Sequence, residues 1–599
     1  MCGIAGAINY NKYNIDFIKS SLYHRGPNEQ SNYIYENIAL IHTRLSIQDI
    51  SNGHQPFHYK NYSIIFNGEI YNHIKLRDKL KEFNFQTTSD TETLLYMYIK
   101  YKEKCFEKLD GMFAFCILNK DTNKLILARD RAGKKPLYLY KDQKSLLFAS
   151  ELRAIKAGVN NLDINEIAIE SYLRSGFFFK DNSPYKNVIT IQAGHFYTID
   201  IDSLNINSQK YFDIKDYYNK PSNLSFEESL TKIDTLLHKS IKDRLESSDL
   251  EVGAFLSGGI DSSLVVAIAS KYQKNLKTYT VKFNDGYDES HLAKLTANKY
   301  NTKHTELSIS MDLKNDIEKI LLNYSQPFMD SSAIPSYYVA QEAKKHVTVI
   351  LNGDGADEIF GGYRRYVPSA NGLINIASKL SFLTKLLPKP HDKKSLYNYA
   401  YRLLSMANKS GLDFYLSSTI DIFEDVYKFK QNPINQDMDK FIKQTNLDPL
   451  SRMLYLDFNM LLFSDLLIKM DIATMSHSLE GRSPFLSKYI LEFAPTLANQ
   501  YKIKGKSTKH ILRELSKKYL PKELITQPKR GFEVPLKKWI ENDLKENIFD
   551  TLQTNSYSSN FIDNTFINDL LNKKINVSDE KRAKMLWTMY ALEVWKKAK

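Results

Sequence analysis

Cysteine is scarce in this chain, which has only Cys2, Cys105 and Cys116 among its 599 residues. Three scattered cysteines do not make a disulfide framework, and no zinc-site spacing is present. Disulfide-linked folds belong to oxidising compartments, so the shortage of cysteine predicts a protein of the reducing cytoplasm.

Long apolar runs are also missing. No uninterrupted stretch approaches the roughly 18 apolar residues that a bilayer-spanning helix requires. The apolar residues at the start of the chain have no basic leader before them, unlike a secretion signal. We therefore expect a soluble protein without a membrane partner.

Positive charge is plentiful but spread out. The net charge is +13, and basic patches can neutralise the phosphates of nucleic acids. Lysine pairs such as 134–135, 344–345 and 537–538 are dispersed along the chain, however. Solvated surface lysines explain this pattern, so we expect no nucleic-acid partner.

The first part of the chain alternates short apolar segments with turn residues. Residues 113–118 with 125–128, and 137–140 with 146–149, predict two antiparallel hairpins. A helical pattern begins at Asp90. This part of the sequence therefore predicts a sheet-rich domain.

A domain boundary is expected where apolar periodicity is lost. We interpret residues 206–224 as a linker between a first domain at 2–205 and a second at 225–599. Ser225 and Glu228 then predict a capping box, the signature of a helix start.

The second domain begins with alternating strand and helix patterns. Short β-branched segments at 252–256, 278–283 and 347–351 are each followed by polar or glycine-rich residues. Such alternation predicts a parallel sheet covered by helices, with ligands at the carboxyl ends of the strands. From about residue 373 onward the chain is predicted to be mostly helical.

The stretch Ser257-Gly258-Gly259-Ile260-Asp261-Ser262-Ser263 lies between a predicted strand and a helix. Its glycines allow close approach to a polyphosphate, and the first amides of the helix attract negative charge. Asp261 suits a Mg²⁺ ion held beside phosphates. A plain serine-glycine turn is the alternative. The stretch resembles the pyrophosphate loop of the ATP pyrophosphatase superfamily, which implies cleavage of ATP between its α and β phosphates.

A second polar loop follows residues 347–351. Asp354, Asp357 and Glu358 stand within five residues of a glycine-rich turn, a pattern that suits Mg²⁺ and nucleotide binding. Calcium binding of the helix-loop-helix kind is excluded because the ligand spacing and the closing glutamate are missing.

Cys2 follows the initiator methionine. Removal of that methionine would leave one residue with both a thiol and an α-amino group, whose unperturbed pKa of about 7.7 to 8.0 suits a base near neutral pH. A cysteine at this position is weak evidence by itself.

Further motifs surround Cys2 in the first domain. They are Cys2-Gly3-Ile4-Ala5-Gly6, His24-Arg25-Gly26-Pro27, Arg44-Leu45-Ser46-Ile47, Asn67-Gly68-Glu69-Ile70-Tyr71-Asn72 and Ser89-Asp90-Thr91-Glu92. Together they resemble class II glutamine amidotransferases of the N-terminal-nucleophile type. For Asn67-Gly68 alone, a hairpin turn is the default interpretation.

This resemblance implies a role for each motif. Cys2 would attack the side-chain amide of glutamine, Asn67 and Gly68 would hold the oxyanion, and Arg44 would pair with the substrate carboxylate. Asp90 and Glu69 would receive the α-amino group. The implied glutamine-binding residues are Arg44, Leu45, Ser46, Ile47, Gln48, Asn67, Gly68, Glu69 and Asp90.

Motifs in the second domain extend the resemblance over almost the entire chain. They are Leu467-Ile468-Lys469-Met470-Asp471, the stretch Ser478-Leu479-Glu480-Gly481-Arg482-Ser483-Pro484-Phe485, Lys509-His510-Ile511-Leu512-Arg513, and Lys529-Arg530-Gly531-Phe532-Glu533-Val534-Pro535. The chain thus resembles glutamine-hydrolysing asparagine synthetases. The implied fold is α/β and α+β: an N-terminal-nucleophile hydrolase αββα sandwich, then a parallel-sheet ATP pyrophosphatase domain of the adenine nucleotide alpha hydrolase-like type with a helical C-terminal part.

The same resemblance implies a nucleotide site without a prosthetic group. Its ATP-binding residues would be Leu256, Ser257, Gly258, Gly259, Asp261, Ser262, Val281, Asn352 and Gly353. Asp354 would help form the acyl adenylate. Lys509 would stabilise the charge that develops during attack, and Lys469 is the alternative lysine for this role. Asp261 and Asp357 would hold Mg²⁺. Asn352 and Ser487 depart from the serine and aspartate that many relatives have there, but both keep hydrogen-bonding capacity.

The implied reaction amidates L-aspartate through β-aspartyl-AMP and releases AMP, pyrophosphate and glutamate. Ammonia would have to cross between the domains in a sheltered channel. Another acceptor, such as a uronic-acid sugar, stays open, as does a homodimer. An RNA-modifying protein or a silent nucleotide-binding scaffold fits the paired motifs poorly.

Overall fold

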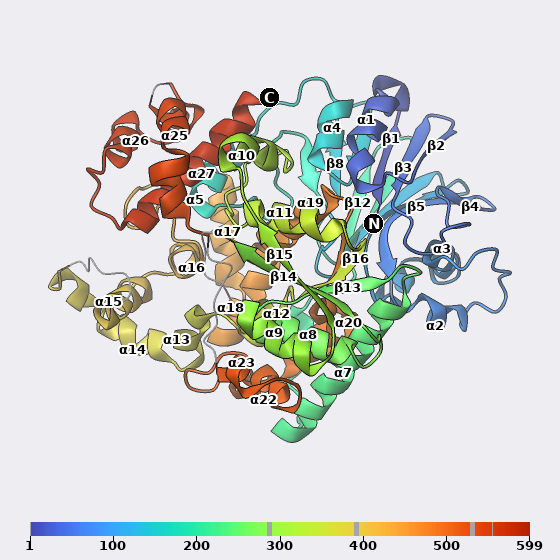
Figure 1. Ribbon diagram of the computed structural model, residues 1–599. Coiled ribbons are helices and arrows are strands. Elements are labelled where there is room, and N and C mark those ends of the chain that lie inside the picture. Colours follow the sequence, from blue (N-terminus) through green and yellow to red (C-terminus); the bar gives the residue numbers. More distant parts are fainter. Residues whose placement is uncertain (1, 284–289, 389–394, 527–533, 554) are drawn as a thin grey trace.

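The computed structural model describes residues 2–283, 290–388, 395–526, 534–553 and 555–599 (Figure 1). Its first half contains two antiparallel sheets of six strands each. One sheet has the order β10-β8-β9-β1-β3-β2 and consists of β1 (Gly3–Ile8), β2 (Glu29–Tyr35), β3 (Ile38–Arg44), β8 (Tyr138–Lys141), β9 (Leu146–Ala149) and β10 (Val188–Thr190). The other has the order β12-β11-β7-β6-β5-β4 and consists of β4 (Phe57–Tyr59), β5 (Tyr62–Ile70), β6 (Gly111–Asn119), β7 (Lys124–Arg129), β11 (His195–Asp200) and β12 (Ile206–Lys210).

Side-chain alternation stacks these sheets into four layers. Ile4 and Ile8 of β1 pack between the sheets against residues of β6 such as Cys116. Ala5 and Ala7 point the other way, toward α1 (Ile15–Ser21) and α4 (Leu152–Gly158). The outer face of the second sheet is covered by α3 (Asp90–Tyr101). The layers follow the order helix, sheet, sheet, helix, which is the expected αββα sandwich. Each sheet buries both of its faces, so it needs a partner layer on each side.

Local predictions for the first half are confirmed with one exception. β6 pairs with β7 and β8 with β9, as the two hairpin patterns predicted. Asn67 and Gly68, however, form no hairpin turn. They lie inside β5 opposite Ala114 and Phe113. A Cβ atom on Gly68 would stand 2.1 Å from the carbonyl oxygen of Met112, so close strand packing, and not a turn, requires the glycine.

The second half is built on a parallel sheet of five strands in the order β15-β14-β13-β16-β17. Its strands are β13 (Val252–Phe255), β14 (Lys277–Phe283), β15 (Lys303–Ile309), β16 (Val349–Leu351) and β17 (Glu480–Arg482). The three predicted strands are confirmed. Sequence reasoning missed β15, whose residues are largely polar, and β17, which is only three residues long within a helical region.

Helices cover this sheet, and further helices lie elsewhere in the described chain. Those before and beside the sheet are α2 (His73–Arg77), α5 (Glu166–Ser175), α6 (Lys215–Tyr218), α7 (Phe226–Glu246), α8 (Ile260–Ala269), α9 (Ser290–Lys299), α10 (Leu313–Leu322) and α11 (Ala333–Lys344). Those after it are α12 (Ala356–Phe360), α13 (Val367–Ala370), α14 (Leu373–Lys379), α15 (Leu396–Ala407), α16 (Gly411–Thr419), α17 (Pro433–Gln444), α18 (Pro449–Asp457), α19 (Leu467–Met475), α20 (Lys488–Phe493), α21 (Asn499–Lys502), α22 (His510–Tyr519), α23 (Lys522–Thr526), α24 (Leu536–Lys538), α25 (Lys545–Leu552), α26 (Asn564–Leu571) and α27 (Asp579–Lys597). α7 begins with the predicted capping box of Ser225 and Glu228.

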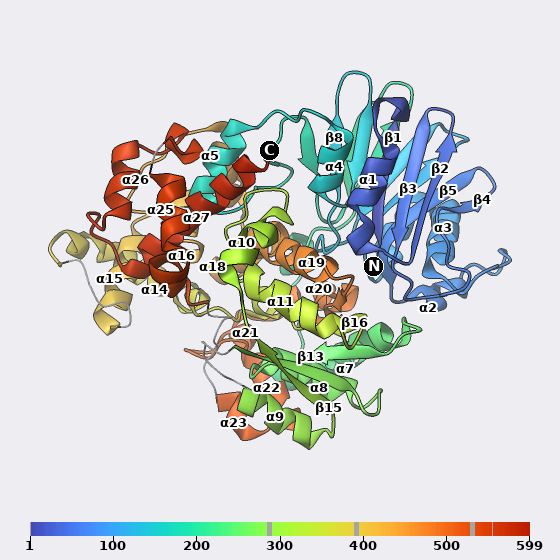
Figure 2. The same ribbon diagram turned by 45° about the horizontal axis from the view of Figure 1, so that its top comes forward.

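Two segments tie the halves together. The expected linker begins with β12, which pairs with β11 and so extends the second antiparallel sheet. Helix α5 leaves the first half and packs beside α27, as both views show (Figures 1 and 2), and it also contacts α17. The Tyr172 hydroxyl of α5 donates to the Thr588 carbonyl oxygen of α27 at 3.4 Å. Within the described ranges, no helix is long and apolar enough to cross a bilayer.

Candidate active sites

A pocket opens beside Cys2 at the start of β1. It is lined by Cys2, Arg44, Leu45, Ile47, Gln48, Gly53, Gln55, Phe66, Gly68, Glu69, Ser89, Asp90 and Thr91. The loop after β3, the middle of β5 and the start of α3 therefore meet at one place, as the resemblance implied. Ser46 is not among the lining residues, and its amide donates to Asn28 Oδ1 at 3.0 Å.

Asn67 stands next to Cys2 although its side chain is not part of the pocket lining. The Cys2 amide donates to Asn67 Oδ1 at 3.1 Å. Asn67 Nδ2 is buried and has no hydrogen-bond partner. A buried, unused donor beside a thiol is what an oxyanion formed on that thiol would need.

The thiol itself needs assistance to react. Burial raises the pKa of Cys2 above its usual range. The thiolate is the reactive form, so a nearby base must take the proton. A free α-amino group on the same residue is such a base, and Met1 lies outside the described residues.

Charged residues at the opposite wall suit an amino-acid substrate. Burial raises the pKa of Asp90 to about 7, and it raises that of Glu69 well above the usual range. A bound ammonium group would favour their ionised forms. Arg44 is held by the carbonyl oxygens of Asp49 at 2.6 Å and Ile50 at 3.2 Å, and a planar guanidinium suits a carboxylate.

The pocket also has walls that the motifs did not predict. Gln55 links two of its sides, since its Oε1 accepts from the Phe66 amide at 2.6 Å and its Nε2 donates to Thr91 Oγ1 at 3.2 Å. Arg482 of β17 reaches Glu69 from the second half, with Nη2 3.4 Å from Glu69 Oε1. Arg482 belongs to a quoted motif, but the sequence carries no signal that it meets Glu69.

The second site lies at the carboxyl ends of β13 and β16, which are neighbours in the parallel sheet. Ser257 follows β13, and Asn352 with Gly353 follows β16. A Cβ atom on Gly353 would stand 3.2 Å from that of Asp261, so the two loops touch. Ser257 Oγ and Ser262 Oγ lie 2.9 Å apart within the first loop. Thr280 Oγ1 donates to the Leu256 carbonyl oxygen at 2.5 Å, and half-buried Val281 is the residue after Thr280.

Lys509 connects the two carboxylates of this site. Its Nζ lies 2.6 Å from Asp261 Oδ2 and 2.8 Å from Asp357 Oδ1. A Cβ atom on Gly362 would stand 1.8 Å from Asp357 Oδ1 and 2.3 Å from Lys509 Cε, so a larger residue there would displace these two side chains. Lys469 pairs with another carboxylate, Asp330, at 2.8 Å.

Asp354 contacts a residue of the first half. Lys134 Nζ lies 3.3 Å from Asp354 Oδ2 and donates to Ser483 Oγ at 2.6 Å. Asn352 Nδ2 donates to the same carboxylate at 2.7 Å. A small pocket next to this contact is lined by both halves, namely by Tyr71, Gly111, Met112, Asp130, Lys134, Arg244, Ser483 and Leu486.

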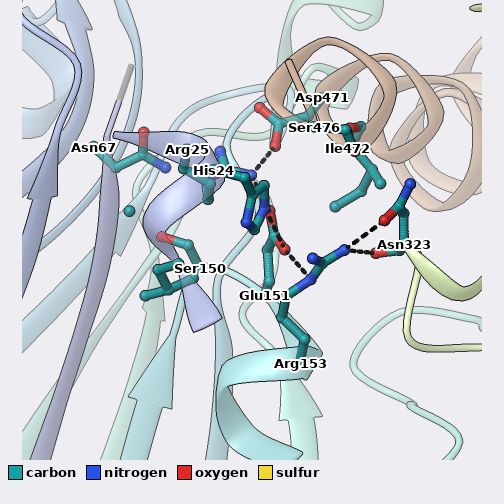
Figure 3. A network of polar contacts seen from close by, with 12 residues as sticks. His24, Arg25, Asn67, Ser150, Glu151, Arg153, Asn323, Asp471, Ile472 and Ser476 are labelled. Atoms are coloured by element: carbon teal, nitrogen blue, oxygen red, sulfur yellow. Dashed lines mark hydrogen bonds and ion pairs between the residues drawn. The ribbon is translucent and has the colours of Figure 1, made fainter. Parts of the chain in front are cut away.

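A buried ionic network lies between the halves on the side of Cys2 (Figure 3). Arg25 Nε donates to the Cys2 carbonyl oxygen at 3.1 Å. Arg25 Nη1 lies 2.6 Å from Glu151 Oε1 and 2.8 Å from Asp471 Oδ2, on α19 of the second half. Asp471 Oδ1 also accepts from Lys135 Nζ at 2.8 Å. Arg153, which pairs with Glu151, donates to the Asn323 carbonyl oxygen at 2.8 Å.

Most sequence-predicted site residues are thus brought into two clusters. Ser46 does not line the pocket beside Cys2, and Lys469 pairs with Asp330 in place of Asp261 and Asp357. Ser487, which departs from the family pattern, caps α20 by accepting from the Ile490 amide at 3.3 Å. Within the motif at 529–535, residues 529–533 lie outside the described residues.

Fold and sites define a class of enzyme: an amidotransferase of the N-terminal-nucleophile type joined to a synthetase with a parallel nucleotide-binding sheet. Family comparison gives the same division. Residues 1–212 match the glutamine amidotransferase domain and residues 232–597 match asparagine synthase. The chain belongs to the asparagine synthase family.

Similar proteins span the whole chain. An asparagine synthetase [glutamine-hydrolyzing] 1 of Bacillus subtilis is 33% identical, over 99% of this chain and 96% of its own length. A putative asparagine synthetase [glutamine-hydrolyzing] 2 of Methanocaldococcus jannaschii is 35% identical, over 64% and 78%. A putative asparagine synthetase [glutamine-hydrolyzing] of Mycobacterium bovis is 29% identical, over 96% and 91%. The family supports a glutamine-dependent amidation that uses ATP.

Proposed function

We propose that the protein converts L-aspartate to L-asparagine, with glutamine as nitrogen donor and ATP as activating substrate. The names of its relatives favour this acceptor. The observation that carries the proposal is the pairing of two dissimilar sites across one interface. A thiol pocket with an unused oxyanion donor lies in one half, and a lysine with two carboxylates lies at the loop end of a parallel sheet in the other.

In the first half, Cys2 attacks the side-chain amide carbon of glutamine. Its α-amino group takes the thiol proton, and the Nδ2 group of Asn67 donates to the oxyanion, with the Gly68 amide as second donor. Arg44 binds the α-carboxylate of glutamine while Asp90 and Glu69 bind its α-ammonium group. Ammonia leaves, and water releases glutamate from the thioester.

In the second half, a carboxylate oxygen of aspartate attacks the α phosphorus of ATP and pyrophosphate leaves. Ammonia then attacks the acyl carbon, and AMP departs. The loop from Ser257 to Ser262 cradles the phosphates, while Asn352, Gly353, Leu256 and Val281 contact the nucleoside. Lys509 offsets the negative charge that builds up during attack, and Asp354 orients the acyl adenylate.

The residues present fit a Mg²⁺ ion. Asp261 Oδ1 is buried without a hydrogen-bond partner, and Asp357 shares Lys509 with Asp261. One or two carboxylates together with substrate phosphates are a common donor set for this cation. Asp261 and Asp357 would hold the ion, which would neutralise phosphate charge when bound.

Ammonia must travel without becoming protonated by bulk water. The pocket lined by Tyr71, Met112 and Lys134 supports a sheltered route, because Tyr71 follows the β5 wall of the glutamine pocket and Lys134 contacts Asp354. The residues 2–212 then act as the amidotransferase domain and the residues from 225 onward as the synthetase domain.

The test is a reaction with ATP, Mg²⁺, glutamine and a panel of carboxylic acids, scored for AMP, ADP and amidated product. We expect AMP formation that depends on aspartate. Cys2→Ala should abolish the glutamine-dependent product and keep the ammonium-dependent one. Product formation with another carboxylate only would remove the aspartate assignment, and ADP as product would remove the adenylation scheme.

A further inference from the structure

The segment from α14 to the start of α15 carries an unusual concentration of exposed apolar side chains. Among the described residues, eight of the sixteen large apolar side chains that are exposed fall between residues 376 and 399. They are Ile376, Leu380, Phe382, Leu386, Leu387, Leu396, Tyr397 and Tyr399. Single exposed apolar residues are ordinary, but a contiguous group marks an interaction surface.

At two places in this segment the usual burial order of polar and apolar side chains is reversed. Leu396 is 88% exposed, whereas Asn398 two residues later is buried. Phe382 is 58% exposed, whereas the adjacent Ser381 is buried. At these two places a polar side chain faces the protein and an apolar one faces solvent, which is costly for a surface that stays in water.

The segment forms one projecting unit, here called the apolar projection and defined as residues 373–388 and 395–402. Its two parts are joined, because the Tyr397 hydroxyl donates to the Pro388 carbonyl oxygen at 2.5 Å and α14 packs against α15. In both views α14 and α15 lie at the edge of the molecule that faces away from the antiparallel sheets (Figures 1 and 2).

Charge indicates which partner fits. The apolar projection contains Lys379, Lys385 and Arg402 and no acidic residue. Within the described ranges, Lys379 and Lys385 have no ion pair, and Arg402 pairs with the half-buried Asp421 at 3.2 Å. Apolar side chains beside lysines and interfacial tyrosines are typical of segments that lie in the interface of an anionic membrane.

We propose that the apolar projection docks this protein on an anionic lipid surface. The leucine and phenylalanine side chains enter the boundary between headgroups and acyl chains, and Lys379 and Lys385 meet the lipid phosphates. A second copy of the chain is the weaker partner, because the apolar projection offers no acidic residue to pair with the lysines of its copy. This proposal replaces the expectation of no membrane partner, which rested only on the lack of a spanning segment.

Vesicle co-sedimentation tests the proposal with the full-length protein. We expect binding to vesicles of phosphatidylglycerol and phosphatidylcholine in equal parts, weaker binding to phosphatidylcholine alone, and loss of the difference at high salt. A chain with Phe382→Ser, Leu386→Ser and Leu396→Ser should bind at least about tenfold more weakly, since each buried apolar side chain contributes a factor of that order. Lys379→Glu with Lys385→Glu should weaken binding to the anionic vesicles selectively.

The matched control is Phe17→Ser on α1, because Phe17 is 63% exposed and lies in the first half. It should leave vesicle binding unchanged. AMP and glutamate formation in solution should be unchanged in all these variants, which shows that they fold. Equal vesicle binding by the triple variant and the native chain would overturn the proposal. Loss of a dimer in the triple variant, with vesicle binding unchanged, would overturn it too and assign the surface to a second copy.

Discussion

Asp471→Asn tests whether the buried network holds the two halves together. The side chain keeps its shape but loses its charge, so two buried cations lose a shared partner. Arg25 retains Glu151 at 2.6 Å. Lys135 has no other ion pair within the described part of the chain, and its Nζ is fully buried. An unpaired buried charge is far more costly than an intact pair is favourable.

The expected loss is about 3 to 5 kcal/mol of stability at neutral pH, the range for breaking a buried ion pair. Lys135→Met removes the stranded cation, so adding it to Asp471→Asn should recover about 1 to 3 kcal/mol. Burial acts to raise the pKa of Asp471, but Arg25 and Lys135 lower it below the usual range. The difference in unfolding free energy between the native chain and the variant should therefore persist at neutral pH. It should shrink only below about pH 4, where the Asp471 carboxyl of the unfolded chain becomes protonated.

Denaturant unfolding followed by tryptophan fluorescence measures this loss, because Trp539, Trp587 and Trp595 all belong to the second half. Glutaminase activity reports on the first half, and it should fall as well since Arg25 Nε donates to the Cys2 carbonyl oxygen. Strictly additive effects of the two substitutions would refute the reasoning. So would an Asp471→Asn chain with native stability.

Three further predictions concern the two pockets. Asn67→Ala should lower kcat for glutamine hydrolysis by a factor of about 10² to 10³, as the loss of an oxyanion donor does. A loss of the same size in ammonium-dependent synthesis would contradict a role of Asn67 as oxyanion donor. Burial raises the pKa of Asp90 to about 7, so the fraction of its carboxylate form grows with pH, and KM for glutamine should fall between about pH 6 and pH 8. Asp90→Asn should raise KM and flatten this pH profile. An unchanged pH profile in the variant would contradict the role of Asp90. Met112→Phe should narrow the pocket between the halves and lower the amount of amidated product formed per glutamine hydrolysed. Ammonium-dependent synthesis is the control and should not change. An unchanged ratio of product to hydrolysed glutamine would exclude this pocket as the ammonia route.

Sequence alone determined the local elements, because their causes lie within a few residues. The helix at Asp90 begins where Ser89 accepts from the Thr91 amide, and Ser225 with Glu228 starts α7 by their own reciprocal hydrogen bonds. The glycine-rich loop after β13 was readable from the order of strand, glycine and helix. The motifs around Cys2 predicted most of the lining of the pocket beside Cys2 for the same reason, since each motif carries its side chains on one short segment.

Tertiary structure alone decided which segments of the two halves meet. Nothing near Arg482 indicates that it reaches Glu69, and nothing near Lys134 indicates that it reaches Asp354, because each pair is joined only by the docking of one half of the chain on the other. Asn67-Gly68 misled for a related reason: the dipeptide permits a turn, but the neighbouring strand β6 extends past it and keeps it in the sheet. Short-range sequence patterns specify conformation, whereas contacts between distant residues depend on how whole layers pack.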